Sequence, residues 1–278
     1  MAAATPDGWD QERAARWVRQ AEDIDRQLQP VSRLLFDAAD LGVGERVLDI
    51  GCGTGPTTRT AATLVGPTGR VTGVDVTDQM LATAAATPTE PGSAPIDWLL
   101  ADPVDWEPPP PPHDVVLSRF GVMFFSSPAI AFRNLADATA PDGRLAIATW
   151  ARRTRSEMFQ VPYRAALAAL GRADELPDDQ GPFSLHGPDV IRPLLEGAGW
   201  GDVDPVVHHL DLPYGGGVDA AGAARMSIDV GPTRILTQGL DEDSLAVVVA
   251  AITDALHPRE VDGTVHLGGT VIVTTARR

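Results

Sequence analysis

The stretch "VLDIGCGTGPTT" (residues 47–58) joins a short apolar run to a glycine-rich turn. The run is typical of a buried strand, and Gly51, Gly53 and Gly55 follow it in the pattern G-x-G-x-G. Such a turn, between a strand and a helix, usually cradles a nucleotide. The pattern by itself leaves hydride, phosphoryl and methyl transfer open.

Neighbouring residues argue against two of these chemistries. A Walker phosphate loop needs a lysine followed by serine or threonine after its last glycine, and no lysine lies near this turn. The dinucleotide fingerprint G-x-G-x-x-G needs a third glycine at position 56, where the chain has Pro56. An NAD-dependent oxidoreductase is therefore kept only as an alternative.

Strand-like and helical segments alternate from residue 45 to residue 150. Strand-like runs cover 45–51, 70–76, 96–102, 113–119 and 143–150, and helices are expected over 57–64, from Asp78 onward and over 127–140. This alternation predicts an α/β fold with a doubly wound parallel sheet. Further along, 203–212 and 264–278 are strand-like, and 187–200 and 219–257 are mostly helical.

Three aspartates mark the neighbouring strands of this predicted sheet. Asp49 lies within the first strand, Asp75 ends the second and Asp102 ends the third. Open α/β sheets bind ligands at the carboxyl ends of their strands. At that edge, Asp75 is placed to accept hydrogen bonds from a ribose diol, and Asp102 from an adenine amino group.

These residues resemble the class I S-adenosylmethionine-dependent methyltransferases, in particular the small-molecule enzymes similar to those of ubiquinone and menaquinone biosynthesis. The motifs are "VLDIGCGTG", "VTGVDV", "LLADPVDW" and "DVVLSRFGVMFF", in order, and "VIVTTARR" fits the family's last strand. The resemblance covers about residues 17–150. It implies a seven-stranded sheet of order 3-2-1-4-5-7-6 with the last strand antiparallel, and S-adenosylhomocysteine as a product.

The resemblance also implies a cofactor site. Gly51 and Gly53 would admit the methionine end, and Asp49 would fix the turn or reach the amino group through water. Asp75 would bind the ribose and Asp102 the adenine. The full predicted set is Asp49, Gly51, Cys52, Gly53, Asp75, Val76, Met80, Asp102, Pro103 and Ser118.

The remaining segments are expected to enclose the substrate. Residues 1–44 are predicted to form an N-terminal helical lid that carries Trp9 and Trp17 and breaks at Pro30. Residues 45–278 would form the methyltransferase domain, with lid insertions at about 151–185 and 213–260. Apolar residues after the fourth strand and in these segments predict a lipophilic or aromatic acceptor; the candidates for contact are Trp17, Phe120, Met123, Trp150, Phe159 and Phe183.

No convincing catalytic base stands out. Methyl transfer from a sulfonium is an in-line displacement that needs alignment and a water-poor site, and a base only if the acceptor must lose a proton. His186, Tyr163 and Arg119 are weak candidates for a catalytic role. Ser118, Arg119 and Phe120 stand where metal-dependent relatives place carboxylates, so no metal is predicted.

Composition narrows the class of partner. The formal net charge of −16 disfavours nucleic acid and anionic membranes as partners, and no apolar run approaches the length of a membrane span. Cys52 is the single cysteine, which excludes an intramolecular disulfide. With no signal-peptide pattern at the N-terminus, a cytoplasmic protein is expected.

The preferred function is methylation of carbon, oxygen or nitrogen on a small molecule. The high content of Ala, Gly, Pro and Arg hints at a GC-rich genome, where specialised metabolism is plentiful. Two alternatives keep the cofactor site but not the transfer. One is a non-methylating reaction of the cyclisation type, and the other is a non-catalytic accessory subunit. The acceptor and the oligomeric state stay open.

Overall fold

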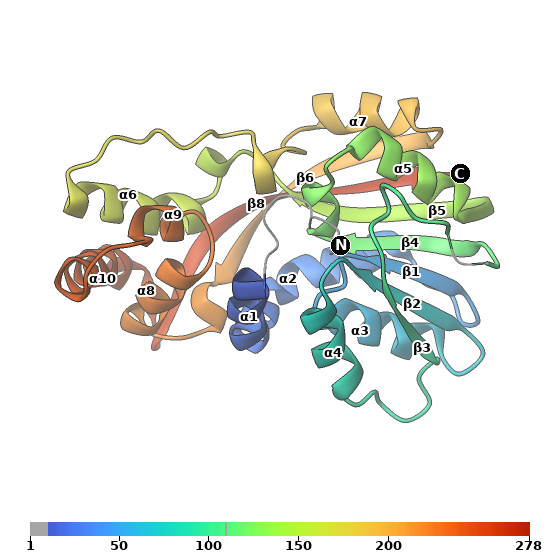
Figure 1. Ribbon diagram of the computed structural model, residues 1–278, viewed down its shortest axis with the longest axis horizontal. Helices are drawn as coiled ribbons and strands as arrows, with labels where there is room; N and C mark the ends of the chain where they lie inside the picture. The colour runs from blue at the N-terminus through green and yellow to red at the C-terminus, as the bar shows by residue number, and fades with distance from the viewer. Residues whose placement is uncertain (1–10, 109) are drawn as a thin grey trace.

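A mixed sheet organises the protein, which is described by a computed structural model over residues 11–108 and 110–278 (Figure 1). The described part contains eight strands in the order β3-β2-β1-β4-β5-β8-β6, with β7 paired to β8 outside this path. The strands are β1 (Arg46–Ile50), β2 (Arg70–Asp75), β3 (Ile96–Leu100), β4 (His113–Arg119), β5 (Thr139–Trp150), β6 (Gly201–Pro213), β7 (Glu260–Val261) and β8 (Thr264–Arg277).

The pairing confirms the predicted topology. Strands β1 to β5 are parallel to their neighbours, whereas β8 runs antiparallel to both β5 and β6. The last long strand is therefore antiparallel, as the resemblance implied. The sequence did not predict β7, a two-residue partner of β8.

Helices cover both faces of the sheet, as Figure 1 shows. On one face, α2 (Ala21–Ala39) and α3 (Pro56–Val65) pack on Val47, Val71 and Val115. On the other, α5 (Pro128–Asp137) and α7 (Pro188–Gly197) pack on Leu48 and Val116. Successive strand residues thus point to opposite faces and both are buried, which is typical of a parallel sheet covered on two sides. Helix α4 (Asp78–Ala86) lies beside β2 and β3.

The two segments expected to form insertions lie together at one end of the sheet. Strands β6 and β8, with 13 and 14 residues, extend past the five-residue β1. Their outer halves meet a group of helices at the left of Figure 1. This insertion cluster consists of α6 (Glu157–Leu170), α8 (Ala220–Asp229), α9 (Thr233–Thr237) and α10 (Glu242–Leu256). Within it, α10 packs on α6 and α8.

The predicted helix break at Pro30 is wrong. The helical segment divides instead at Gln20, between α1 (Gln11–Arg19) and α2, and Pro30 lies inside α2. Proline removes one backbone donor from a helix. Leu28, Val31 and Leu35 are buried on either side of it, so apolar packing holds the helix together there. Trp9 lies outside the described residues.

Strand β5 begins earlier than the sequence predicted. Its bounds, Thr139–Trp150, include Pro141 and start four residues before the predicted run 143–150. An irregularity in the β4–β5 register lies between His113 and Val115, and Asp142 has a positive φ of 66°. A bulged strand start tolerates proline, because no ladder donor is needed there. Among the described residues, no helix is both long and apolar enough to cross a membrane.

Candidate active site

A cavity of about 710 Å³ opens where β1, β2 and β4 end. Its volume lies within the range of about 300–1,000 Å³ that is common for small-molecule sites. Two ends can be distinguished. The glycine-turn end is lined by Gly51, Cys52, Gly53, Asp75, Val76, Met80, Asp102 and Pro103, which is the predicted cofactor set without Asp49 and Ser118. The other end is aromatic and extends to the insertion cluster.

The glycine turn owes its shape to close backbone contacts. Gly51 has a φ of +66°, and a Cβ on it would lie 2.5 Å from the Cα of Gly121. Gly53 also has a positive φ, +57°, but nothing lies within 4 Å of a Cβ built on it. Gly51 therefore allows strand and loop to approach, whereas Gly53 keeps the wall of the cavity open.

Asp75 fixes the turn from the neighbouring strand. Its Oδ2 accepts a hydrogen bond from the Gly53 amide at 2.9 Å, and its Oδ1 accepts one from the Thr77 amide at 2.9 Å. Burial raises the pKa of Asp75 above its ordinary value, although these amides oppose the rise. Each carboxylate oxygen can accept a second hydrogen bond, so the side chain can hold the turn and still bind hydroxyl groups.

Asp102 has a similar place at the end of β3. Its Oδ1 accepts a hydrogen bond from the Val104 amide at 3.0 Å. The Asn134 side chain of α5 donates to the carbonyls of Pro103 and Val104 at 2.9 and 3.2 Å. The loop that carries Asp102 is thereby held against the sheet, with its carboxyl group at the cavity.

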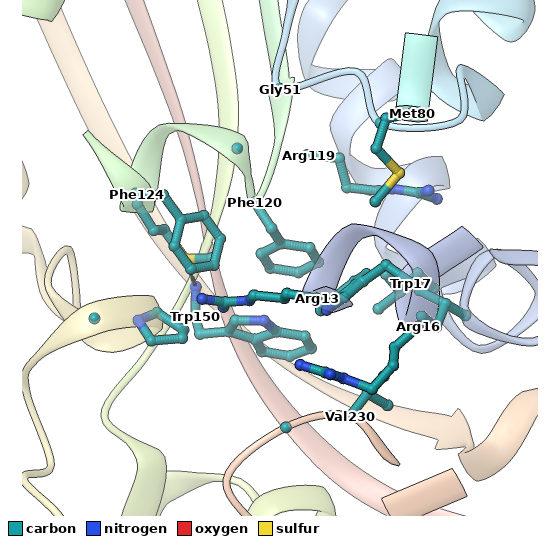
Figure 2. Close-up of a pocket in the computed structure, with 18 of the residues that line it drawn as sticks. Arg13, Arg16, Trp17, Gly51, Met80, Arg119, Phe120, Phe124, Trp150 and Val230 are labelled. Atoms are coloured by element: carbon teal, nitrogen blue, oxygen red, sulfur yellow. Dashed lines mark hydrogen bonds between the residues drawn. The ribbon is translucent and has the colours of Figure 1, made fainter. Parts of the chain in front are cut away.

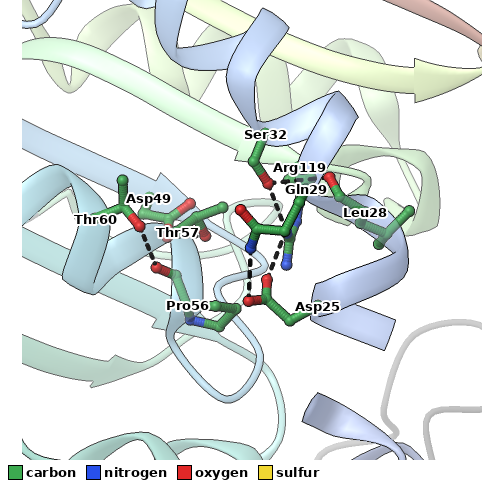
Figure 3. Close-up of polar contacts among 9 residues, drawn as sticks. All are labelled: Asp25, Leu28, Gln29, Ser32, Asp49, Pro56, Thr57, Thr60 and Arg119. Carbon is green, nitrogen blue, oxygen red and sulfur yellow. Dashed lines mark hydrogen bonds and ion pairs between the residues drawn. The ribbon is translucent and has the colours of Figure 1, made fainter. Parts of the chain in front are cut away.

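Asp49 supports the turn from below. It is completely buried, and its Oδ2 accepts hydrogen bonds from the hydroxyls of Thr57 and Thr58, both at 2.7 Å. Its Oδ1 has no hydrogen-bond partner among the described residues. Burial raises the pKa of Asp49 to about 6. Asp49 does not line the cavity and ties β1 to the first turn of α3, beside Thr57 in Figure 3.

Ser118 is a correction to the predicted cofactor set. It is fully buried and absent from the cavity wall. Its hydroxyl donates to the Ile50 carbonyl at 2.7 Å and accepts from the Gly121 amide at 3.2 Å. Because both hydrogen-bonding functions serve the backbone, Ser118 joins the ends of β1 and β4 rather than contacting a ligand.

Four aromatic rings form the wall of the other end. Phe120 stacks on Trp150, with ring centroids 4.2 Å apart and an angle of 5° between the planes. Trp150 meets Phe159 edge-on at 5.1 Å, and Phe159 meets Phe183 edge-on at 5.1 Å. We call Phe120, Trp150, Phe159 and Phe183 the aromatic wall. Offset and edge-on contacts are the favoured geometries of aromatic pairs, so each ring orients the next.

The other predicted substrate residues, Met123 and Trp17, also line the cavity. The sulfur of Met123 accepts a hydrogen bond from the Trp150 amide at 3.3 Å. Trp17 reaches the cavity from α1 and lies to the right of Trp150 in Figure 2. All six residues predicted to contact substrate therefore face one space.

The weak catalytic candidates fare differently. Arg119 lines the cavity, and its Nη1 donates to Asp25 Oδ1 at 2.8 Å and to Ser32 Oγ at 2.6 Å, as Figure 3 shows. His186 and Tyr163 do not line the cavity. The His186 ring is bonded to the Phe183 carbonyl, 3.1 Å away, and Tyr163 is buried beneath the Arg153 guanidinium. Neither placement supports a catalytic role, because a catalytic group must reach the reacting atoms.

Several cavity residues were not foreseen. Arg13 and Arg16 lie on the same face of α1 as Trp17, and α9 contributes Arg234. The spacing of positions 13, 16 and 17 matches one helix face and could have indicated them. In the part of the chain that the structure describes, no group of three or more His, Cys, Asp or Glu residues could hold a metal ion.

A doubly wound sheet with an acid-flanked glycine turn at its carboxyl edge defines a nucleotide-binding α/β protein. Residues 47–143 match the family described as "Methyltransferase domain". The chain is 31% identical over 180 residues to aklanonic acid methyltransferase DauC of Streptomyces sp. (strain C5), covering 62% of this chain and 81% of that protein. The protein belongs to the class I S-adenosylmethionine-dependent methyltransferases.

Two further relatives resemble parts of the chain or its fold. Nocamycin O-methyltransferase of Saccharothrix syringae is 37% identical over 120 residues, which cover 43% of this chain and 42% of that protein. The crystal structure titled a putative methyltransferase from an antibiotic biosynthesis pathway of Anabaena variabilis superposes with a TM-score of 0.59. It is 15% identical and covers 90% of this chain and 98% of that one, so it supports the fold alone.

Proposed function

We propose that this methyltransferase transfers a methyl group from S-adenosylmethionine to a carbon, oxygen or nitrogen atom of a lipophilic or aromatic small molecule. The observation that carries the proposal is the continuity of the cavity. Its glycine-turn end has the groups suited to an adenosine and a methionine, and the aromatic wall lies in the same space. When bound, the cofactor supplies an electrophilic methyl group on a sulfonium leaving group.

The described residues fit this cofactor. Gly53 leaves the wall open beside the turn, where the methionine end would lie. Asp75 retains acceptor capacity for the ribose hydroxyls, and Asp102 is placed for the adenine amino group. Val76 and Met80 line the same end and would pack on the adenosine. Cys52 is buried beneath the turn, and burial raises the pKa of its thiol, so it would act by size alone.

The protein's own contribution to the reaction is alignment and the exclusion of water. Trp17 from α1 and Phe159 from the insertion cluster cover the cavity from two sides. We propose that α1 and the segments 151–185 and 213–260 act as the lid over the substrate. Holding two reactants in line at short range is worth several orders of magnitude in rate.

The cavity wall offers little for general base catalysis. No histidine lines it among residues 11–108 and 110–278. Tyr214 does line it, but burial raises the pKa of its hydroxyl well above the ordinary value. A weakly acidic acceptor would therefore lack a partner for its proton, which favours acceptors that are already nucleophilic when they bind.

The named relatives support a place in specialised metabolism. Their names refer to aklanonic acid and nocamycin, and the chain covers most of the first protein but less than half of the second. An acceptor from a tailoring step, of polycyclic or similar shape, would suit a cavity with an aromatic wall.

Methyl transfer is tested by mass spectrometry with S-adenosylmethionine that carries a trideuterated methyl group and a panel of aromatic acceptors. The proposal predicts one labelled methyl per product and an equal amount of S-adenosylhomocysteine. A product of unchanged mass, formed without S-adenosylhomocysteine, would show the cyclisation type of reaction instead. Cofactor binding without turnover of any acceptor would support the accessory role.

A further inference from the structure

The mouth of the cavity, opposite the aromatic wall, concentrates positive charge. Arg13 and Arg16 reach it from α1, and Arg234 reaches it from α9. The chain as a whole has a formal net charge of −16, so this arginine group opposes the overall balance. A local excess of one sign at a cavity mouth attracts ligands of the opposite sign.

A carboxylate already lies between two of these arginines. Glu12 Oε1 is 2.5 Å from Arg16 Nη1 and 3.3 Å from Arg234 Nη2. The Glu12 side chain is 75% exposed, whereas that of Arg16 is only 13% exposed. The two guanidinium groups are therefore positioned for one carboxylate, and the present occupant is an exposed surface side chain that a ligand can displace at low cost.

One of these arginines, Arg13, lies close to an aromatic ring of the cavity. The Arg13 guanidinium is 5.3 Å from the centroid of the Phe124 ring. Figure 2 shows Arg13 and Arg16 extending from α1 toward Trp150, while Gly51 and Met80 lie at the opposite end of the view. An anion held by the arginines would therefore be attached to a ring lying along the aromatic wall, away from the glycine turn.

We propose that the acceptor is an aromatic molecule that carries a carboxylate, and that Arg16 and Arg234 bind this carboxylate in the position now taken by Glu12. The proposal rests on the proposed function, because it assigns the substrate class of the same cavity. The planar, two-pronged guanidinium matches a carboxylate in geometry as well as charge. Glu12 then competes with the substrate for the same site.

The remaining charged groups at this end are consistent with an anionic ligand. Asp229 also lines the cavity and keeps its negative charge, since its Oδ2 accepts a hydrogen bond from the neutral Gln20 amide at 3.1 Å, but the three arginines outnumber Asp229 and Glu12. Arg119 is neutralised by Asp25, 2.8 Å away. Removal of the Glu12 charge would break its ion pairs with Arg16 and Arg234, so a Glu12 variant is expected to gain affinity for an anionic ligand.

Calorimetry with a matched pair of probes tests this assignment. The probes are anthraquinone-2-carboxylate and its neutral carboxamide, titrated into the full chain saturated with S-adenosylhomocysteine. We expect the acid to bind about tenfold more tightly than the amide, because a charged hydrogen-bonded pair replaces a neutral one. Arg16→Met and Arg234→Met should each remove most of this preference while binding of the amide stays within twofold.

Glu12→Gln should change the affinity for the acid in the opposite direction to the arginine variants. It should tighten binding of the acid several-fold and leave the amide unchanged, a result that a misfolded variant cannot give. Arg152→Gln is the control, because Arg152 pairs with Asp179 on the surface and does not line the cavity. Equal affinity for acid and amide, or no gain in Glu12→Gln, would overturn the proposal.

The cofactor titration separates this inference from the proposed function. If Arg16→Met weakens S-adenosylhomocysteine as much as it weakens the acid, the arginines serve the cofactor and the inference is wrong. If the wild-type protein does not bind S-adenosylhomocysteine, the proposed function itself fails. If the cofactor binds normally and the acid has no advantage, only the carboxylate assignment is lost.

Discussion

Asp25 on α2 and Arg119 at the end of β4 form an ion pair with 2.8 Å between Oδ1 and Nη1, beside the cavity. The Arg119 side chain is 9% exposed, so its charge is largely removed from water. The pair fastens the N-terminal helices to the sheet at the point where the glycine turn begins. In Figure 3 the two residues meet between α2 and the strand.

Loss of this pair should loosen α2. Asp25→Asn leaves the Arg119 guanidinium with Ser32 as a neutral partner, so we expect the free energy of unfolding to fall by about 1–3 kcal/mol. Chemical denaturation measures the change. Arg70→Gln is the control, because Arg70 pairs with Asp97 and both are about half exposed, and such a pair is worth at most about 1 kcal/mol. Equal losses in the two variants would contradict the account.

Asp49 should make stability depend on pH. Its pKa of about 6 in the folded protein lies above the value of about 3.9 in an unfolded chain. Between these values the folded state binds the proton more tightly, so the contribution of Asp49 to the free energy of unfolding falls as pH rises from about 4 to about 6.

Asp49→Asn removes this titration. Denaturant unfolding of both proteins across that range should show the wild type losing about 1–3 kcal/mol relative to the variant as pH rises. The comparison uses the change in the free energy of unfolding with pH, so any cost of the substitution that does not depend on pH cancels. A difference between the two proteins that does not change with pH would contradict the assignment of the raised pKa to Asp49.

Gly51 and Gly53 should respond differently to alanine. Gly51→Ala places a Cβ 2.5 Å from the Gly121 backbone at a positive φ, so we expect a loss of stability of about 3 kcal/mol or more. Gly53→Ala meets open space and pays only for its positive φ, about 1 kcal/mol. Its Cβ would instead obstruct the ligand, so S-adenosylhomocysteine should bind at least tenfold more weakly while the fold persists.

Thermal unfolding of the Gly51→Ala and Gly53→Ala proteins measures the loss of stability, and calorimetry with S-adenosylhomocysteine measures the loss of cofactor affinity. A Gly53→Ala protein with normal cofactor affinity would show that the open side of the turn is not where the methionine end lies.

Phe159 should affect the acceptor and not the cofactor. It links Trp150 to Phe183 by edge-on contacts at 5.1 Å, and it lies on α6 in the insertion cluster. Phe159→Leu keeps an apolar side chain but loses the ring contacts, worth about 0.5–1.5 kcal/mol per pair. We expect KM for an aromatic acceptor to rise about fivefold with the affinity for S-adenosylhomocysteine unchanged. If the variant binds S-adenosylhomocysteine more weakly and KM for the acceptor is unchanged, the aromatic wall contacts the cofactor and not the acceptor.

Local pattern was sufficient for much of the fold. Strand β4 has the predicted bounds, His113 to Arg119, because its apolar run is flanked by prolines and by Gly121. Asp75 and Asp102 lie where the alternation of strands and helices put them, since parallel strands end at the same edge. Pro30 was misjudged because its penalty is local, whereas the packing of Leu28 and Val31 that outweighs it comes from distant strands.

Side-chain roles were harder to predict, because they depend on contacts between distant segments. Ser118 follows the pattern of a ligand-facing residue, yet its hydroxyl is used by Ile50, 68 positions away. At the cavity mouth, Arg234 donates a hydrogen bond to Glu12, which lies 222 positions away in the sequence. Spacing along one helix could indicate Arg13 and Arg16, but nothing local to α9 indicates that Arg234 joins them.

The most direct measurement is the calorimetric titration of S-adenosylhomocysteine into the wild-type protein and the Asp75→Asn and Asp97→Asn variants. Asp75→Asn keeps one oxygen for the turn but loses acceptor capacity for the ribose, so binding should weaken at least tenfold. Asp97→Asn, on the neighbouring strand and away from the cavity, should bind as the wild type does. No binding to the wild type, or equal affinity in all three proteins, would contradict the account.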